Sequence, residues 1–226
     1  MTGSFRGAAL LLALAAATPA LAGPQELLAA AAFQAKTKPA AIAEVNQALA
    51  QANATVARNP RDHDALVSRA IATGYHAQLT RSAGEAKDAR RQFEALLAAN
   101  ANDPEALIGL ASWHMNSIAD LGGFVAGTVL GASKSQGLGY LNRAVAAGQG
   151  RALFPAYAAM LRIRLDPSAV APARQLAEAA IKAPAPTPVD QELQRRALRL
   201  LAPLRSGNGA NAAALAKQLM PLGTLG

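Results

Sequence analysis

Residues 103–114 read DPEALIGLASWH, and residues 137–145 read GLGYLNRAV. In the first stretch, Asp103 stands before Pro104, and this order favours the start of a helix because Asp caps free N–H groups and Pro suits the first helical position. In the first stretch, apolar residues and His114 recur at i, i+3, i+4 and i+7. In the second, small and apolar residues recur at i, i+4, i+7 and i+8. Each spacing places its residues on one face of a helix. The residues on these two faces are Leu107, Leu110, Ala111 and His114, and then Gly137, Leu141, Ala144 and Val145.

Both faces recur on either side of this central unit. We expect three units of two helices each, over residues 59–102, 103–148 and 151–183. The first helical face returns as Leu66, Arg69, Ala70, Thr73 and as Phe154, Tyr157, Ala158, Leu161. The second returns as Ala89, Phe93, Leu96, Leu97 and as Ala173, Ala177, Ala180, Ile181.

This order of motifs resembles the tetratricopeptide repeat, which pairs a W-x2-L-G-x2-Y helix with an A-x3-F helix. Leu107-x2-Leu110-Ala111-x2-His114 and Ala89-x3-Phe93 carry the resemblance, which covers residues 59–182. First helices follow one another after 41 and 47 residues instead of about 34. The chain is also similar to the periplasmic, repeat-built helper subunit of tripartite (TRAP) transporters, whose helix pairs are irregular. Both resemblances imply a superhelix of antiparallel helix pairs with a concave binding face.

Composition predicts an all-α fold. Hydrophobic residues make up 52% of the 226 residues, much of this being alanine, the best helix former, whereas aromatic residues make up only 4%. No stretch alternates β-branched or aromatic residues with polar ones, so strands are not expected. We therefore predict one domain over residues 23–226, an irregular repeat-like stack of about ten helices whose core depends on close helix contacts.

The start of the chain has the three parts of a secretory signal. Arg6 supplies the positive charge, residues 8–17 the apolar stretch, and residues 20–22 the small-residue cleavage site. We predict a signal peptide over residues 1–22 that is cleaved, and hence a periplasmic protein. The chain has no cysteine, which excludes disulfides, a thiol nucleophile and a lipid anchor on an N-terminal cysteine.

The charge of +8 would be +7 after removal of Arg6 with the signal, since 21 basic residues would face 14 acidic ones. Such a surplus fits a solvated basic surface or contact with anionic partners. Four arginines cluster near the end of the chain and form either a solvated helix face or a contact for an acidic partner or anionic lipid. They are Arg195, Arg196, Arg199 and Arg205. Nucleic acid is not an expected partner, because the signal directs the chain to the periplasm.

No constellation in the sequence predicts catalysis. The three histidines, His63, His76 and His114, are 13 and 38 residues apart and share no metal-ligand spacing. There is no nucleophile elbow, and the glycines near residue 122 lack the lysine-serine ending of a phosphate-binding loop. We expect neither an enzyme nor a metal or other cofactor.

Two functional hypotheses remain. The first is a non-catalytic scaffold or adaptor that holds a protein segment on its concave face, through Trp113, His114 and Tyr75, with Arg69 as a polar contact. The second is a ligand-binding accessory subunit of an envelope transporter, closed by the segment from Phe124 to Leu130. An open groove would favour the scaffold, and an enclosed apolar cavity the ligand carrier.

The insertion over residues 121–133 departs furthest from the repeat. It carries four glycines and no charged residue, so it could fill a gap in the core or dock a partner. Ordering so many glycines costs conformational entropy, which buried contacts must offset. We therefore expect Phe124, Val129 and Leu130 to pack against the helices and not to extend into solvent.

Overall fold

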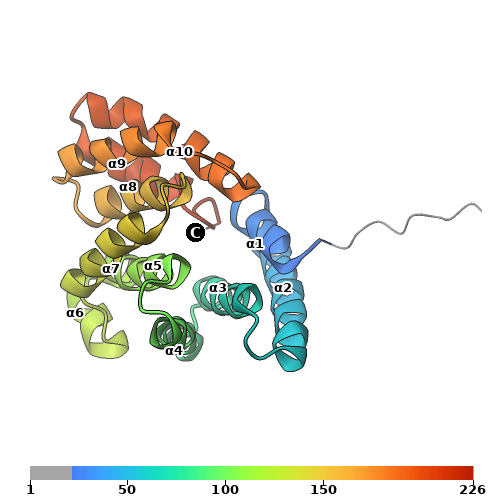
Figure 1. Ribbon diagram of the computed structural model, residues 1–226. Helices are drawn as coiled ribbons and strands as arrows, with labels where there is room; N and C mark the ends of the chain where they lie inside the picture. Colours follow the sequence, from blue (N-terminus) through green and yellow to red (C-terminus); the bar gives the residue numbers. More distant parts are fainter. Residues whose placement is uncertain (1–21, 226) are drawn as a thin grey trace, which may run out of the picture.

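The computed structural model describes residues 22–225, and in this part of the chain it is all-helical, with no strand (Figure 1). The helices are α1 (Pro24–Phe33), α2 (Lys38–Arg58), α3 (His63–Thr80), α4 (Ala83–Ala99), α5 (Pro104–Leu121), α6 (Gly123–Val125), a π-helical turn η1 (Ala126–Leu130), α7 (Lys134–Ala147), α8 (Leu153–Leu165), α9 (Val170–Lys182), α10 (Pro188–Arg205) and α11 (Gly209–Leu219).

The expected all-α fold is confirmed. The signal peptide expected over residues 1–22 falls outside the described residues except for Ala22. Within residues 22–225, no helix has both the length and the apolar character needed to cross a bilayer.

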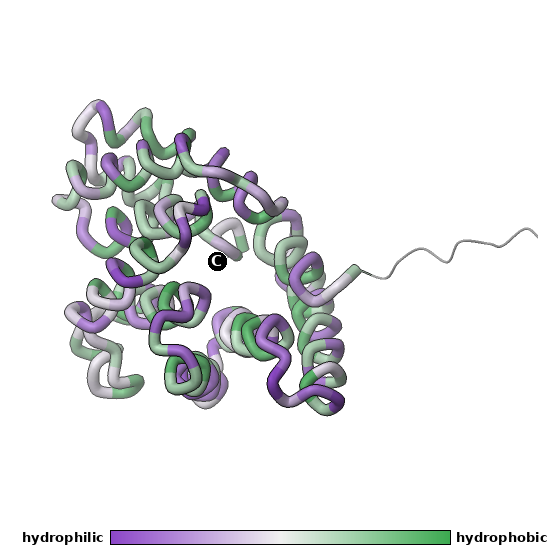
Figure 2. Tube along the Cα trace, viewed as in Figure 1, coloured by the Kyte–Doolittle hydropathy of each residue, from purple (hydrophilic) through white to green (hydrophobic). Residues whose placement is uncertain are grey.

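Local sequence signals explain where the helices begin. In α5, the Asp103 carboxylate accepts a hydrogen bond from the Ala106 N–H at 2.9 Å, and Pro104 occupies the first helical position. The same kind of side-chain cap starts α2, α3, α4, α7, α10 and α11, at Thr37, Asp62, Ser82, Ser133, Thr187 and Asn208. Short capped turns bring successive helices back against one another as antiparallel pairs, and hydropathy alternates within each helix (Figure 2).

Alanine and glycine let the helices approach closely. Ala111, Ala144, Ala158 and Ala177 are all fully buried in the largest core cluster. Two of the few aromatic side chains lie directly over glycines. A Cβ at Gly109 would lie 2.5 Å from the Phe93 ring, and one at Gly148 would lie 2.2 Å from the Phe154 ring. Glycine is therefore required at both positions for the ring to fit.

A buried carboxylate joins three distant elements. Asp190, at the start of α10, is fully buried and accepts hydrogen bonds from the Leu153 N–H and from the Arg151 guanidinium, each at 3.1 Å. Arg151 also pairs with Glu105 of α5 at 3.1 Å. Because a buried charge is tolerated only when it is paired and hydrogen-bonded, this network fixes α5, α8 and α10 relative to one another.

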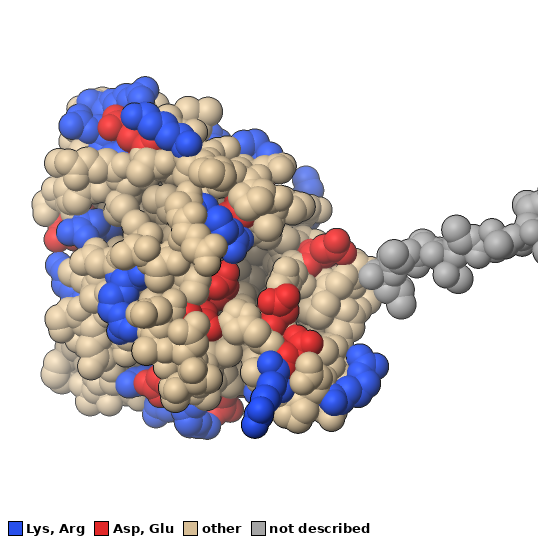
Figure 3. Space-filling view, viewed as in Figure 1, with Lys and Arg blue, Asp and Glu red and all other residues tan. Residues whose placement is uncertain are grey.

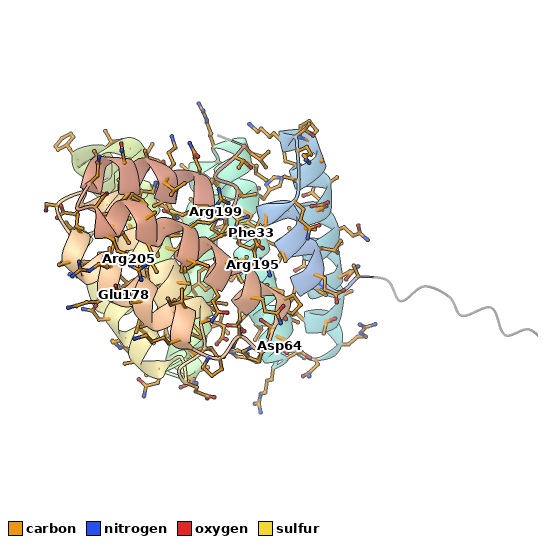
Figure 4. The ribbon with its side chains drawn as sticks, turned by 90° about the horizontal axis from the view of Figure 1, so that it is seen from above. Phe33, Asp64, Glu178, Arg195, Arg199 and Arg205 are labelled. Atoms are coloured by element: carbon orange, nitrogen blue, oxygen red, sulfur yellow. The ribbon has the colours of Figure 1, made fainter. Side chains whose placement is uncertain are left out.

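The array curves until its first helices meet its last ones, with the C-terminal segment at the centre (Figure 1). We call Met220–Leu225 the strap. The Leu222 N–H donates to the Ala32 carbonyl at the end of α1, at 2.9 Å. Nearby, the guanidinium carbon of Arg196 lies 4.4 Å from the centre of the Phe33 ring, and Figure 4 shows Phe33 beside the part of α10 that carries Arg195 and Arg199. The helices thus form a nearly closed ring.

Two glycine substitutions test the role of close packing. Gly139 lies inside α7 with no atom within 4 Å of an added Cβ. Gly139→Ala should therefore raise the free energy of unfolding by about 0.5–1 kcal/mol, the ordinary helix-propensity gain. Gly109→Ala should instead lower it by about 1–3 kcal/mol, because the Phe93 ring must move. Chemical denaturation measures both, and equal effects of the two substitutions would contradict this account of the core.

Candidate functional site

Three buried residues of the insertion fix it to the helical array. Leu130, Ala126 and Ala132 are buried against Trp113 of α5. The Trp113 indole N–H donates to the Ala86 carbonyl of α4 at 2.7 Å. The insertion therefore packs on α4 and α5, and the expected packing of Leu130 against the helices is confirmed.

His114 supports the end of the same insertion. Its Nδ1 accepts a hydrogen bond from the Ser133 N–H at 3.1 Å, and its ring is stacked on Tyr140 of α7 at 5.9 Å between centroids. Burial, followed by the positive charge of Arg90, lowers the pKa of His114 to about 4. The imidazole is therefore neutral at pH 7, with the proton assigned to Nε2 by the hydrogen bond at Nδ1.

These contacts correct the expected roles of Trp113 and His114. Their side chains are 9% and 1% exposed and face α4, the insertion and α7, so they do not line an open groove. Helical spacing indicated correctly that His114 is buried, whereas Trp113 did not belong to the buried face that the spacing identified. It could not indicate that the insertion would be what covers them.

Other side chains of the insertion are exposed to solvent. Phe124 is 85% exposed and Val129 48%, so the expectation that they pack against the helices was wrong. We call Leu121, Phe124, Val125 and Val129 the apolar tip. Gly122, directly after Leu121, and Gly131, two residues after Val129, have positive φ angles of +78° and +76°, which a residue with a side chain would disfavour. Helix α6, which carries Phe124 and Val125, lies on the outside of the ring (Figure 1).

Arg69 lies elsewhere, in an open groove of about 440 Å³ between α3 and α4. Leu66 and Leu96 provide its apolar walls. The Arg69 Nε and the Gln92 Oε1 are both buried there without a hydrogen-bond partner, and Arg69 forms no ion pair within residues 22–225. Unpaired buried polar atoms are costly, and these two lie beneath the wall of the groove.

Tyr75 is partly buried and packs against the apolar cluster that contains Leu222 of the strap. Burial, together with Tyr157 nearby, raises the pKa of the Tyr75 hydroxyl, so it stays neutral. Tyr75, which was expected to contact a partner, thus packs against the same apolar cluster as Leu222 of the strap. The structure therefore separates the expected site residues into four locations: the insertion contact, the apolar tip, the α3–α4 groove and the ring centre.

A small polar pocket of about 200 Å³ opens near the start of α3 and α5. His63 Nε2 lies 2.6 Å from the buried Asp103 carboxylate, and Arg151 pairs with Glu105 on the opposite side. Burial lowers the pKa of His63, but the hydrogen bond and charge of Asp103, helped by Asp64, outweigh it and leave the pKa raised. Figure 3 shows acidic and basic groups together around this hollow.

The pocket is lined by the start of α3, the α4–α5 turn and the start of α5, and by the segment that joins α7 to α8. Its lining contains no serine, threonine or lysine side chain. No group of three His, Asp or Glu side chains able to hold a metal ion is found between residues 22 and 225. The pair of His63 and Asp103 joins the starts of two helices, a structural role.

No protein-family model, curated protein or solved structure matches the chain.

Acid should destabilise the protein through His114. As the pH falls below about 6.5, the unfolded chain binds a proton at this residue, while the folded His114 stays neutral down to about pH 4. Stability is therefore lost across this window, by about 2 kcal/mol between pH 7 and pH 5. His114→Asn retains an acceptor near the Nδ1 position but does not titrate. Denaturation at both pH values should show a loss smaller by this amount in the variant, and equal losses would contradict the assignment.

Substitutions at buried and at exposed residues of the insertion should differ in their effect on stability. Leu130 is 8% exposed, so Leu130→Ser should remove about 2–3 kcal/mol and lower the melting temperature by roughly 5 °C or more. Phe124→Ser should leave it within about 1 °C, because a surface side chain away from other contacts changes stability little. A large loss in the Phe124 variant would show that the tip is packed in solution.

Proposed function

We propose that the protein is a non-catalytic, tetratricopeptide-repeat-like scaffold of the periplasm, and that it binds a partner protein through the apolar tip. One observation carries the proposal: the insertion exposes Leu121, Phe124, Val125 and Val129, although Ala126, Leu130 and Ala132 beside them in the sequence are buried. Groups of exposed large apolar side chains often mark protein–protein interaction sites. The predicted signal peptide supports the periplasmic location.

The form of the tip suits a docking element. A π-helical turn is rare and is often found at functional sites. Here the turn η1 carries both the exposed Val129 and the buried Leu130. The contacts of Leu130, Trp113 and Ser133 hold the base of the insertion, so little order has to be created on binding. The tip therefore presents a preorganised apolar surface.

The α3–α4 groove also favours the scaffold over the ligand carrier, because it is open to solvent. It lies along two helices and combines the apolar Leu66 and Leu96 with the unpaired Arg69. A partner segment could engage such a groove through an apolar side chain and a carboxylate. The groove is a second contact in this proposal, and the proposal does not depend on it.

The decisive experiment is photo-crosslinking in periplasmic extract from the source organism. A photoreactive phenylalanine at position 124 should crosslink one defined protein. In pull-downs with the unlabelled chain, Phe124→Ser combined with Val129→Ser should weaken capture of that protein at least ten-fold, since burying each side chain contributes about 1.5–3 kcal/mol.

Leu198→Ser is the matched control. Leu198 is 58% exposed but lies on α10, away from α6. The Leu198→Ser variant should capture the same protein as the parent chain does. If the Phe124 and Val129 variant also retains full capture while remaining folded, the tip is not the binding surface and the proposal fails.

A further inference from the structure

The strap lies against an apolar cluster that belongs to the other end of the chain. Apart from Leu222, every buried member of this α1–α3 cluster comes from α1, α2 or α3: Leu27, Leu28, Ala31, Ala41, Val45, Ala48, Ala72 and Leu79. Leu222 is 2% exposed within it, and Leu225 packs at its edge. Met220, two residues earlier, belongs instead to the core of the C-terminal helices. The chain thus leaves its own core at Met220 and enters a second one.

The strap also makes the backbone contact that a bound peptide would make. The Leu222 N–H donates to the Ala32 carbonyl, in the last turn of α1. Carbonyls at the end of a helix have no partner within the helix and need one from outside. Leu222 thus contributes one buried side chain and one main-chain hydrogen bond to the contact with the first helices. Within the strap the chain forms a turn, in which the Gly223 N–H donates to the Met220 carbonyl and the Leu225 N–H to the Leu222 carbonyl.

Local backbone preference does not favour the shape of the strap. Leu222 has φ +60°, the left-handed region that a residue with a Cβ disfavours. Gly223 lies so close to the Lys217 carbonyl that a Cβ would be only 2.0 Å from it. Residues held in the left-handed region, as Leu222 is, are found at ligand clamps and switch regions.

We propose that the α1–α3 cluster is a binding site for an uncharged, leucine-bearing peptide segment that adopts a turn, and that the strap is its resident occupant. The residues from Leu219 to Leu225 carry no charge, which defines the chemistry that the site accepts. A segment of a partner protein with this chemistry displaces the strap and opens the ring between α1 and the C-terminal helices. This site is separate from the apolar tip, so the inference goes beyond the scaffold function and does not rest on it.

The test uses the full chain and a synthetic peptide. The probe is a fluorescein-labelled peptide of residues 217–225, KQLMPLGTL, and the control peptide has Asp at the position of Leu222. Leu222→Asp in the protein should release the strap by placing a charge in the apolar cluster. Fluorescence anisotropy should show that the probe binds this variant at least ten-fold more tightly than the parent chain, whereas the control peptide should bind neither. If a folded Leu222→Asp variant does not bind the probe, the strap is a fixed part of the core and the inference is wrong.

Hydrogen exchange in the parent chain provides a second test if that variant does not fold. Release of the strap breaks the hydrogen bond of the Leu222 amide without unfolding the helices. The Leu222 amide should therefore exchange at least 100-fold faster than the amides of Leu110 and Met160, which lie in the cores of α5 and α8. Exchange of all three at the same slow rate would show that the strap opens only with global unfolding, and would overturn the proposal.

Discussion

Close approach between helix backbones is the condition on which this structure depends. With aromatic residues at only 4% of the chain, the core has few large side chains. Its helices bury apolar surface by bringing alanine faces together, and the few rings that are present lie over glycines. Phe93 over Gly109 and Phe154 over Gly148 are the two clearest cases. A core of this kind has little room to absorb added volume, because interiors are packed as densely as organic crystals.

Acidic residues are placed so that a basic chain can still bury charge. Asp103 and Asp190 are almost completely buried, and both lie at helix N-termini, where the helix dipole and free N–H groups favour a carboxylate. Arg151 completes this arrangement by pairing with both Glu105 and Asp190. Much of the acidic complement thus serves to start and join helices, while the basic surplus lies at the surface. The positive charge of the protein is a property of its exterior.

Local features of the sequence were enough to predict the helices. The spacing of Leu107, Leu110 and Ala111, with the cap at Asp103, identified a helix and its buried face, because both effects act within a few residues. The candidate site was harder to predict. Arg69 and Phe124 are accessible, but Trp113 and His114 are covered by an insertion whose path depends on glycine conformations with no simple sequence signal. The strap could not be predicted either, because Leu222 and Ala32 are 190 positions apart (222 minus 32) and nothing local connects them.

Ring closure changes how the protein must fold and unfold. In an open array of helix pairs each unit contacts only its neighbours, so the ends can fray independently. Here Ala32 and Phe33 are held by residues near position 200 and beyond, which adds contacts of very long sequence separation to an otherwise local fold. Such contacts form late, because the cost of closing a long loop comes first. The surroundings of α1 are therefore incomplete until Leu222 has been synthesised, and the first helix of the chain is among the last to acquire its final contacts.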